Sequence, residues 1–296
     1  MVAKQKMLAV SGLFSGAVTW GLIWYPYRLL GSAGISGSLS SLLTYLVALA
    51  LGLAFFPSAL GKFRRAGWLL VWIGLTAGWT NLAYVLAVIH GEVMRVLLLF
   101  YLSPFWTVIF AHLLLREKTA GAGYGVMGLS LAGAVVMLWR PELGLPLPQN
   151  QAEWMGLSAG LMFALSNVLA RKAQDFDVSA KSFSVWSGVA ALSLLPLLWN
   201  PAEFQPLAAL PLGGWLWLLA IGVAIFGVTL TVQYGLAHTP ANQAIVIFLF
   251  ELVVAAISSY FLAGEAMTVQ EWAGGAMIVA ASLFSGKLEQ KHDADH

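Results

Sequence analysis

Charged residues are scarce in this chain of 296 residues: they make up 9% of it, whereas hydrophobic residues make up 60%. Soluble domains carry roughly 25% charged residues, so a soluble fold of this length could not cover its surface with so few. The apolar runs are also too long and too numerous for core helices, because a spanning helix needs ~20 apolar residues. The composition predicts an all-α polytopic membrane protein.

Cysteine is absent, which excludes disulfides and thiolate metal sites. His90 and His238 have no second histidine or carboxylate at ligand spacing, so we expect neither a metal centre nor a cofactor, and we interpret both as turn residues. An intramembrane enzyme would need a nucleophile and a base at compatible depth, and no such pair is visible. The net charge of +2 argues against a nucleic-acid partner.

Ten apolar segments are long enough to be read as membrane spans. Proline-rich or polar stretches separate them, and the proline-containing stretch 140–153 is the boundary that best divides the chain into halves. The predicted spans are 7–29, 38–58, 68–89, 93–115, 121–139, 154–172, 183–199, 213–235, 241–262 and 270–286. We therefore expect a first five-helix repeat over 1–140, a periplasmic linker over 141–153 and a second five-helix repeat over 154–296.

The positive charges indicate the orientation. With the N-terminus inside, twelve of the 15 lysines and arginines, Lys181 among them, fall in inner segments, and only Arg28, Arg95 and Arg140 fall outside. Both termini are then cytoplasmic. Because each half has an odd number of helices, the second half runs inverted relative to the first, which is a common construction among secondary transporters.

Two stretches, one beginning at residue 90 and the other 148 positions later, share a pattern. Each has a polar corner, a long apolar run with a polar break near its middle, and a terminal glutamate. Repetition at half the chain length indicates duplication. The identical positions, aligned without a gap, are His90 with His238, Phe100 with Phe248, Ile109 with Ile257, Leu114 with Leu262 and Glu117 with Glu265.

Residues 123–128 match the G-x-G-x-x-G nucleotide-binding pattern. No strand precedes them and they open an apolar span, so the context that the motif requires is missing. We instead expect Gly121, Gly125, Gly128 and Ala132 to form a small-residue stripe for close helix packing.

Aromatic, amide and hydroxyl side chains recur inside the predicted spans. Any one of them is more often a packing residue, but amides do not face lipid comfortably because nothing there bonds them. Such side chains therefore either join helices or line a polar cavity. The candidates for a substrate-binding cavity are Trp20, Trp24, Asn81, Tyr84, Tyr101, Asn167, Gln233 and Tyr234.

Glu251 is an acid near the middle of a predicted span. An intramembrane carboxyl is costly and is a functional candidate by default. A neutral carboxyl bonded across helices, or a misplaced span end, is an equally good reading. No lysine or arginine lies at the same predicted depth, so burial favours its neutral form. We expect it either to contact the ammonium of a substrate or to carry a proton.

The two inverted five-helix repeats, each with a leucine-rich fourth helix that ends in glutamate, resemble the drug/metabolite transporter superfamily, EamA type. Pro104 with Arg116-Glu117 carries the family pattern in the first repeat, and Gly264-Glu265 carries it in the second, where Leu252 replaces the proline. The aromatic-rich first, third and fourth helices are similar to those of the YddG-type aromatic amino-acid exporters. The resemblance implies that the fifth and tenth helices are peripheral.

The sequence observations predict a transporter of small amphipathic organic molecules. The resemblance implies that it exports aromatic and other apolar amino acids across a bacterial inner membrane. Alternating access would pass the substrate through a central cavity between the repeats. Partners other than the substrate and the bilayer are not indicated, and a monomer suffices. A broad drug/metabolite efflux carrier is the alternative, followed by an intramembrane enzyme or a channel.

Overall fold

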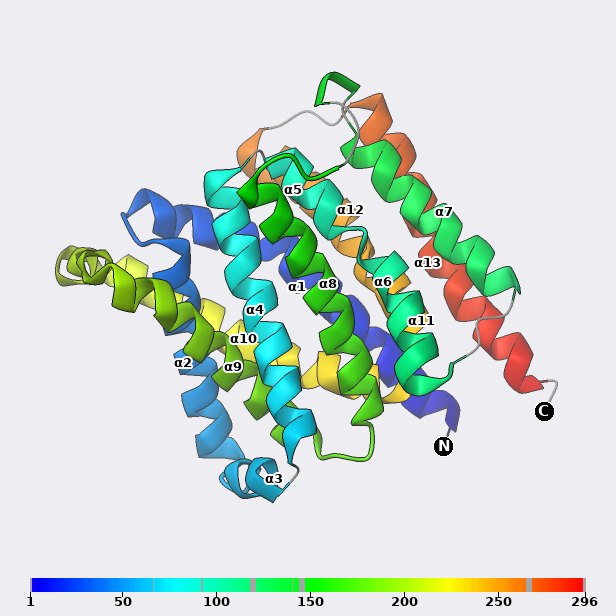
Figure 1. Ribbon diagram of the computed structural model, residues 1–296, viewed down its shortest axis with the longest axis horizontal. Coiled ribbons are helices and arrows are strands. Elements are labelled where there is room, and N and C mark those ends of the chain that lie inside the picture. Colours follow the sequence, from blue (N-terminus) through cyan, green and yellow to red (C-terminus); the bar gives the residue numbers. More distant parts are fainter. Residues whose placement is uncertain are drawn as a thin grey trace.

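The computed structural model describes residues 2–294 except 66, 92, 118–120, 140, 144–146 and 265–267. Every regular element in these residues is a helix (Figure 1). Glu92 and Glu265 lie outside the described residues. The first half contains α1 (Val2–Ser32), α2 (Gly37–Phe55), the short α3 (Ala59–Arg65), α4 (Trp68–His90), α5 (Val93–Phe100), α6 (Ser103–Phe110), the π-helical η1 (Ala111–Leu115) and α7 (Gly121–Leu138).

The second half follows the 3-10 turn η2 (Pro141–Leu143). It contains α8 (Gln151–Lys172), α9 (Val178–Trp199), the 3-10 segment η3 (Pro201–Ala209), α10 (Leu212–His238), α11 (Ala241–Phe248), α12 (Phe250–Ala263) and α13 (Val269–Ala294). Each of the ten predicted spans coincides with one of these helices or with a broken helix.

Seven helical segments of the described chain are long and apolar enough to cross a membrane. They correspond to α1, α2, α4, the α5–α6–η1 run, α9, α10 and the α11–α12 run. The apolar part of α7 is shorter, over 123–138. Glu153, Arg171 and Lys172 make α8 more polar, and α13 carries a charged tail. The prediction of an all-α polytopic membrane protein is therefore confirmed, and among the described residues seven of the ten predicted spans meet the length and hydropathy of a crossing helix.

The helices form one bundle with a peripheral pair. In the bundle, α4 packs on α8 and α9, α1 packs on α10 and α12, and α2 packs on α9 and α10. The α7 and α13 helices pack mainly on each other and lie side by side at one edge (Figure 1). This edge position is the one that the family resemblance implied.

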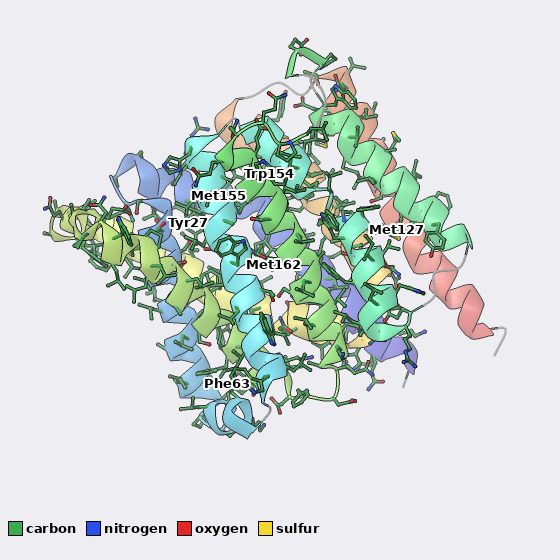
Figure 2. The ribbon with its side chains drawn as sticks, in the orientation of Figure 1. Tyr27, Phe63, Met127, Trp154, Met155 and Met162 are labelled. Carbon is green, nitrogen blue, oxygen red and sulfur yellow. The ribbon has the colours of Figure 1, made fainter. Side chains whose placement is uncertain are left out.

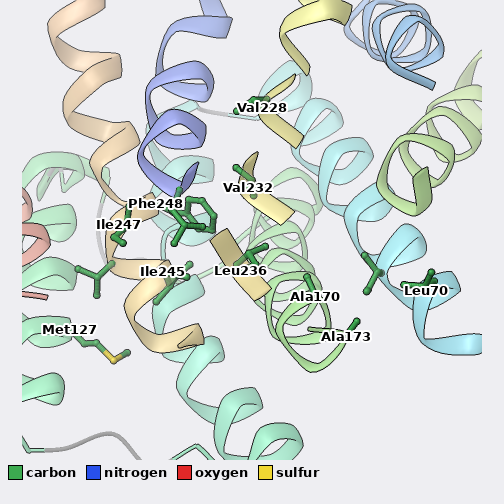
Figure 3. Close-up of a cluster of buried hydrophobic side chains, with 14 of the residues drawn as sticks. Leu70, Met127, Ala170, Ala173, Val228, Val232, Leu236, Ile245, Ile247 and Phe248 are labelled. Carbon is green, nitrogen blue, oxygen red and sulfur yellow. The ribbon is translucent and has the colours of Figure 1, made fainter. Parts of the chain in front are cut away.

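Apolar side chains fill two parts of the bundle. One cluster gathers around α10 and α11, where Val232, Leu236, Ile245 and Phe248 are buried (Figure 3). A second cluster extends along α2, where Tyr27 of α1 and Phe63 of α3 pack against it (Figure 2). The hydroxyl of Tyr27 is 3.0 Å from that of Thr44 on α2, so its polar group has a partner in this apolar region.

The fourth and ninth predicted spans are each broken at their middle. The first break follows Phe100, where residues 101 and 102 form a turn between α5 and α6. The second follows Phe248, where Leu249 separates α11 from α12. Phe100 and Phe248 are the identical residues of the two repeated stretches, so the breaks occur at equivalent sequence positions. The sequence reading placed a polar interruption of each apolar run near this point but expected each span to be one continuous helix.

The prediction for Lys181 is wrong. The sequence reading began the seventh span at residue 183 and assigned Lys181 to a loop, but α9 begins at Val178. Asp177 caps that helix by accepting a hydrogen bond from the backbone N–H of Ser179 at 2.9 Å. Lys181 is consequently one turn inside the helix, and its side chain is fully buried (0% exposed).

The prediction for the glycine stripe of α7 is also wrong. A Cβ added at Gly121, Gly125 or Gly128 would meet nothing within 4 Å, so these residues do not mediate close packing. The close approach between α7 and α13 occurs instead at Gly133, where a Cβ would lie 2.8 Å from the carbonyl oxygen of Gly274. The face that carries Gly133 is turned toward the neighbouring helix, and the predicted stripe is turned away from it.

Candidate functional site

A continuous chain of aromatic rings crosses the bundle between the two halves. Tyr84 of α4 contacts Phe100 of α5, which contacts Phe163 of α8. Phe163 contacts Phe248 of α11, and Phe248 contacts Trp20 of α1. Successive ring centroids are 5.2, 5.4, 5.7 and 5.7 Å apart, which is the range of favourable aromatic pairs.

The aromatic chain adjoins a carboxylate–phenol pair. Tyr101, beside Phe100 at the first helix break, makes a side-chain hydrogen bond with Glu251. Glu251 is half-buried and lies in the first turn of α12, directly after the second break. The hydroxyl of Tyr101 is the donor when Glu251 is ionised, because a carboxylate only accepts. The two breaks thus bring a polar pair from both halves to the centre of the bundle.

The first break has an identifiable cause. Proline has no backbone N–H, so Pro104 cannot donate to the carbonyl of Phe100, four residues earlier. That carbonyl lies against α8 at Gly160, where a Cβ would be 2.3 Å from its oxygen. The absence of a side chain at Gly160 therefore allows α5 and α8 to approach closely beside the aromatic chain.

Three predicted site residues contact side chains outside the aromatic chain and the Tyr101–Glu251 pair. Asn81 on α4 accepts a hydrogen bond from Ser193 of α9 at 3.4 Å. Trp24 donates to Ser258 of α12 at 2.9 Å. The ring of Tyr234 stacks on His238 at the end of α10, with centroids 4.2 Å apart. The first two contacts join neighbouring helices, and the third lies within α10.

The two histidines occupy equivalent positions. His90 is the last residue of α4 and His238 is the last residue of α10, and both are exposed. The ring Nδ1 of His90 is 2.9 Å from the carbonyl oxygen of Leu86, and that of His238 is 2.9 Å from the carbonyl oxygen of Tyr234. They terminate helices at the polar corners, as the turn interpretation expected.

An ionic cluster closes one end of the bundle. Arg171, near the end of α8, is 3.3 Å from Glu117 and also donates to the carbonyl of Ala237 on α10. The other carboxylate oxygen of Glu117 accepts from the backbone N–H of Ala241, the first residue of α11, at 3.1 Å. Glu117 thus satisfies a free N–H at a helix start, where a negative charge is favourable. We call this region the Arg171 end.

Polar groups are also buried one turn inside the Arg171 end. Asn167 of α8 and Gln233 of α10 are 8% and 4% exposed. Within the described residues, the side-chain nitrogen of Asn167 and the side-chain oxygen of Gln233 make no hydrogen bond. The ammonium of Lys181 is 3.5 Å from the backbone carbonyl of Gln233. This group is separate from the Tyr101–Glu251 pair.

Of the residues predicted from the sequence, the structure brings Trp20, Tyr84, Tyr101 and Glu251 together. The sequence reading did not select Phe100, Phe163 and Phe248 as site residues. The signal for two of them was present, because Phe100 and Phe248 are identical across the two repeated stretches. Phe163 and Lys181 carry no such signal.

The chain has relatives among known proteins. The EamA-like transporter family model matches residues 150–286. An uncharacterized transporter of Archaeoglobus fulgidus is 27% identical over 234 residues, which cover 79% of this chain and 82% of the relative. The pseudopaline exporter CntI of Pseudomonas aeruginosa is 24% identical over 291 residues, with 96% of each chain covered.

A solved crystal structure has the same fold. It superimposes on 96% of this chain and 98% of its own with a TM-score of 0.73, at 19% sequence identity. The full-length coverage shows that both halves and the peripheral α7–α13 pair follow an architecture already known. The second half of the chain is thus similar to the EamA-like transporter family, both relatives are described as transporters, and the all-helical fold is that of the solved structure.

Proposed function

We propose that this protein is a membrane transporter of the EamA-like family, and that it exports small amphipathic metabolites, aromatic and other apolar amino acids foremost. The observation that carries the proposal is the juxtaposition of an aromatic chain with a hydrogen-bonded carboxyl at two helix breaks. Aromatic rings receive an apolar body, and they attract a cation through their faces. Glu251 supplies the acceptor that an ammonium group needs. A substrate with an apolar side chain and an amino group matches both.

The proposal includes a two-fold organisation, with repeats over 1–140 and 154–296 joined by the linker 141–153. Helix pairing supports it, because the contacts occur in exchanged pairs: α1 packs on α10 and α4 packs on α8. Likewise α4 packs on α9 and α2 packs on α10, while α2–α9 and α7–α13 pair with their own counterparts. Alternating access then requires one half to rock against the other around the central site.

The proposal also includes the orientation. Most lysines and arginines fall on the side of the Arg171 end, which places that end and both termini in the cytoplasm of a bacterial inner membrane. The ionic cluster then closes the cytoplasmic side of the path. We treat the carrier as a monomer whose partners are its substrate and the bilayer, without cofactor or metal.

A broad metabolite exporter is the second candidate. The relative that favours it is the pseudopaline exporter, which is similar over 96% of this chain. Amide groups inside the bundle, such as Asn167 and Gln233, would suit a more polar substrate than an aromatic amino acid.

Uptake into proteoliposomes tests the proposal. A panel of amino acids is offered with and without an imposed proton gradient, and we expect saturable uptake with preference for aromatic and branched side chains. Phe163→Ala should weaken that preference because it interrupts the aromatic chain, whereas Tyr124→Ala on the exposed face of α7 should not. Absence of uptake for every amino acid in the panel would contradict the proposal.

A further inference from the structure

Lys181 is a fully buried cation with few partners. Its side chain is 0% exposed, and its hydrogen bond within the described chain is the 3.5 Å contact with the carbonyl of Gln233. An ammonium group can donate three hydrogen bonds, and a charge in a protein interior is normally paired. The buried ammonium of Lys181 therefore requires an anionic partner.

The nearby acids are already engaged or outside the bundle. Asp177 and Asp175 are exposed, and Asp177 is 2.7 Å from the ammonium of Lys62. Although burial raises the pKa of Asp177, the hydrogen bonds from Lys62 and Ser179 outweigh it and lower that pKa. Asp177 is thus ionised but directed to a surface lysine. Glu117 pairs with Arg171. The guanidinium of Arg171 is itself a further positive charge close to Lys181.

The helix register brings two amides to the same level as Lys181. Arg171 of α8 contacts the carbonyl of Ala237 on α10, so the two helices approach the Arg171 end together. One turn earlier on each helix are Asn167 and Gln233. Lys181 reaches the backbone carbonyl of Gln233, and Asn167 and Gln233 each lie one turn before the Arg171–Ala237 contact, so we assign the three residues to one buried layer.

The polar atoms of this layer have the chemistry of a carboxylate site. Lys181 and the side-chain nitrogen of Asn167 are donors, and a carboxylate accepts from both. The unbonded side-chain oxygen of Gln233 is an acceptor that a substrate ammonium can meet. Glu251 lies ten residues into the α11–α12 run and Lys181 lies three residues into α9, so we treat this layer and the Tyr101–Glu251 pair as separate sites.

We propose that Lys181, Asn167 and Gln233 form a second binding site, which takes the carboxylate of the substrate at the Arg171 end of the transport path. The inference rests on the proposed function, because it assigns the carboxylate of the transported substrate to a binding site distinct from the Tyr101–Glu251 pair. It restricts the substrates to carboxylate-bearing metabolites. An amine that fits the aromatic chain but has no carboxylate would then bind only at the Tyr101–Glu251 pair.

Binding of paired probes to the purified full-length chain in lipid nanodiscs tests this site. Phenylalanine and phenethylamine differ in the carboxylate, and we expect the wild type to bind phenylalanine at least about tenfold more tightly, as one charge-assisted hydrogen bond allows. Lys181→Met should remove this preference and leave phenethylamine binding unchanged. The matched control Lys62→Met, at an exposed lysine, should keep it.

Three results would overturn the inference: a preference for phenylalanine that survives in Lys181→Met, an equal loss for both probes, or a wild type that does not discriminate. A failure of the proposed function would give a different result: the protein would bind phenylalanine more tightly than phenethylamine but would not take up amino acids in proteoliposomes. Folding is checked by thermal unfolding. We expect Lys181→Met to raise the Tm, since an apolar side chain replaces an incompletely paired buried charge.

Accessibility gives a readout independent of affinity. The chain has no cysteine, so Lys181→Cys or Asn167→Cys introduces one thiol. If the layer lines the path, an impermeant anionic thiol reagent will modify each variant, and phenylalanine will protect it. Resistance of both folded variants to the reagent would show a sealed core, and the second site would be wrong.

Discussion

At the scale of single residues, the Tyr101–Glu251 pair explains how a carboxyl is tolerated in an apolar span. Glu251 has no basic residue at its depth in the sequence, and the structure supplies a phenol in its place, through the hydrogen bond with Tyr101. A phenol satisfies the carboxylate without neutralising it. Glu251 therefore remains able to exchange its phenol partner for a substrate ammonium or a proton, as membrane acids in transporters do.

Replacing Glu251 with glutamine separates these roles. Glu251→Gln keeps the shape and the hydrogen bond with Tyr101 but cannot titrate. We expect proteoliposomes with this variant to lose the stimulation of uptake by a proton gradient and to retain exchange of substrate across the membrane. The control is Glu142→Gln, at an exposed position. Wild-type behaviour of Glu251→Gln from pH 5.5 to 8, roughly the range over which a perturbed carboxyl titrates, would show that the residue is structural.

Some of these residues were predictable from the sequence and others were not. Glu251 stands out because a charge inside an apolar run is rare. The identity of Phe100 and Phe248 across the repeated stretches also pointed to the centre. Asn81 has the same polarity as a cavity residue, but its partner on α9 depends on helix rotation, which the sequence does not define. Lys181 was assigned to a loop because α9 begins five residues earlier than its hydrophobicity indicates.

At the scale of helices, the breaks after Phe100 and Phe248 depend on close backbone packing. Pro104 accounts for the first, whereas no proline marks the second, and the chain there tightens so that the N–H of Leu252 bonds the carbonyl of Leu249 at 3.1 Å. The pattern of polar residues marked the middle of both apolar runs, but the sequence reading expected continuous spans there. It did not predict which glycines face a neighbouring helix, since small residues occur on both the packed and the open faces of α7.

Gly160→Ala tests the packing of α8 on α5. Its Cβ would lie 2.3 Å from the carbonyl oxygen of Phe100, a backbone atom that cannot rotate away. Overpacking of this kind costs about 1–3 kcal/mol, so the free energy of unfolding should fall by that amount and the Tm should decrease. Gly125→Ala, which meets nothing within 4 Å, is the matched control and should be neutral or slightly stabilising. Equal stability of the two variants would mean that α5 and α8 do not approach at Gly160.

The ionic cluster at the Arg171 end ties segments from both halves. A double-mutant cycle with Arg171→Met and Glu117→Gln should give a coupling energy of about 1–2 kcal/mol, because residues in one hydrogen-bonded network are not additive and both side chains are 22% exposed. Thermal or denaturant unfolding in detergent measures it. The same cycle on the exposed pair Lys62 and Asp177 should give less than about 1 kcal/mol. If the effects of Arg171→Met and Glu117→Gln on the free energy of unfolding are additive, the cluster does not link the two halves.

At the scale of the whole molecule, the proposed inverted repeat depends on an odd number of spans in each half. An odd count would place equivalent helices in opposite directions, so that the two broken helices would approach the centre from opposite sides. The predicted number of spans and the predicted boundary between the halves come from hydrophobic runs and from the proline-containing linker. The exchanged packing of α1 on α10 and α4 on α8 requires three-dimensional information, because no local pattern specifies which helix of the other half is the neighbour.

Thiol labelling tests the orientation on which this arrangement depends. The chain has no cysteine, so Leu147→Cys in the linker introduces a single thiol at a side chain that is 64% exposed. If the linker is periplasmic, an impermeant maleimide added to intact cells will label it, because outer loops are the ones poor in lysine and arginine. Lys62→Cys, at the opposite side in this orientation, should be labelled only after the membrane is opened. Labelling of Leu147→Cys from the cytoplasmic side alone would reverse the orientation, and the Arg171 end would then close the external mouth of the path instead of the cytoplasmic one.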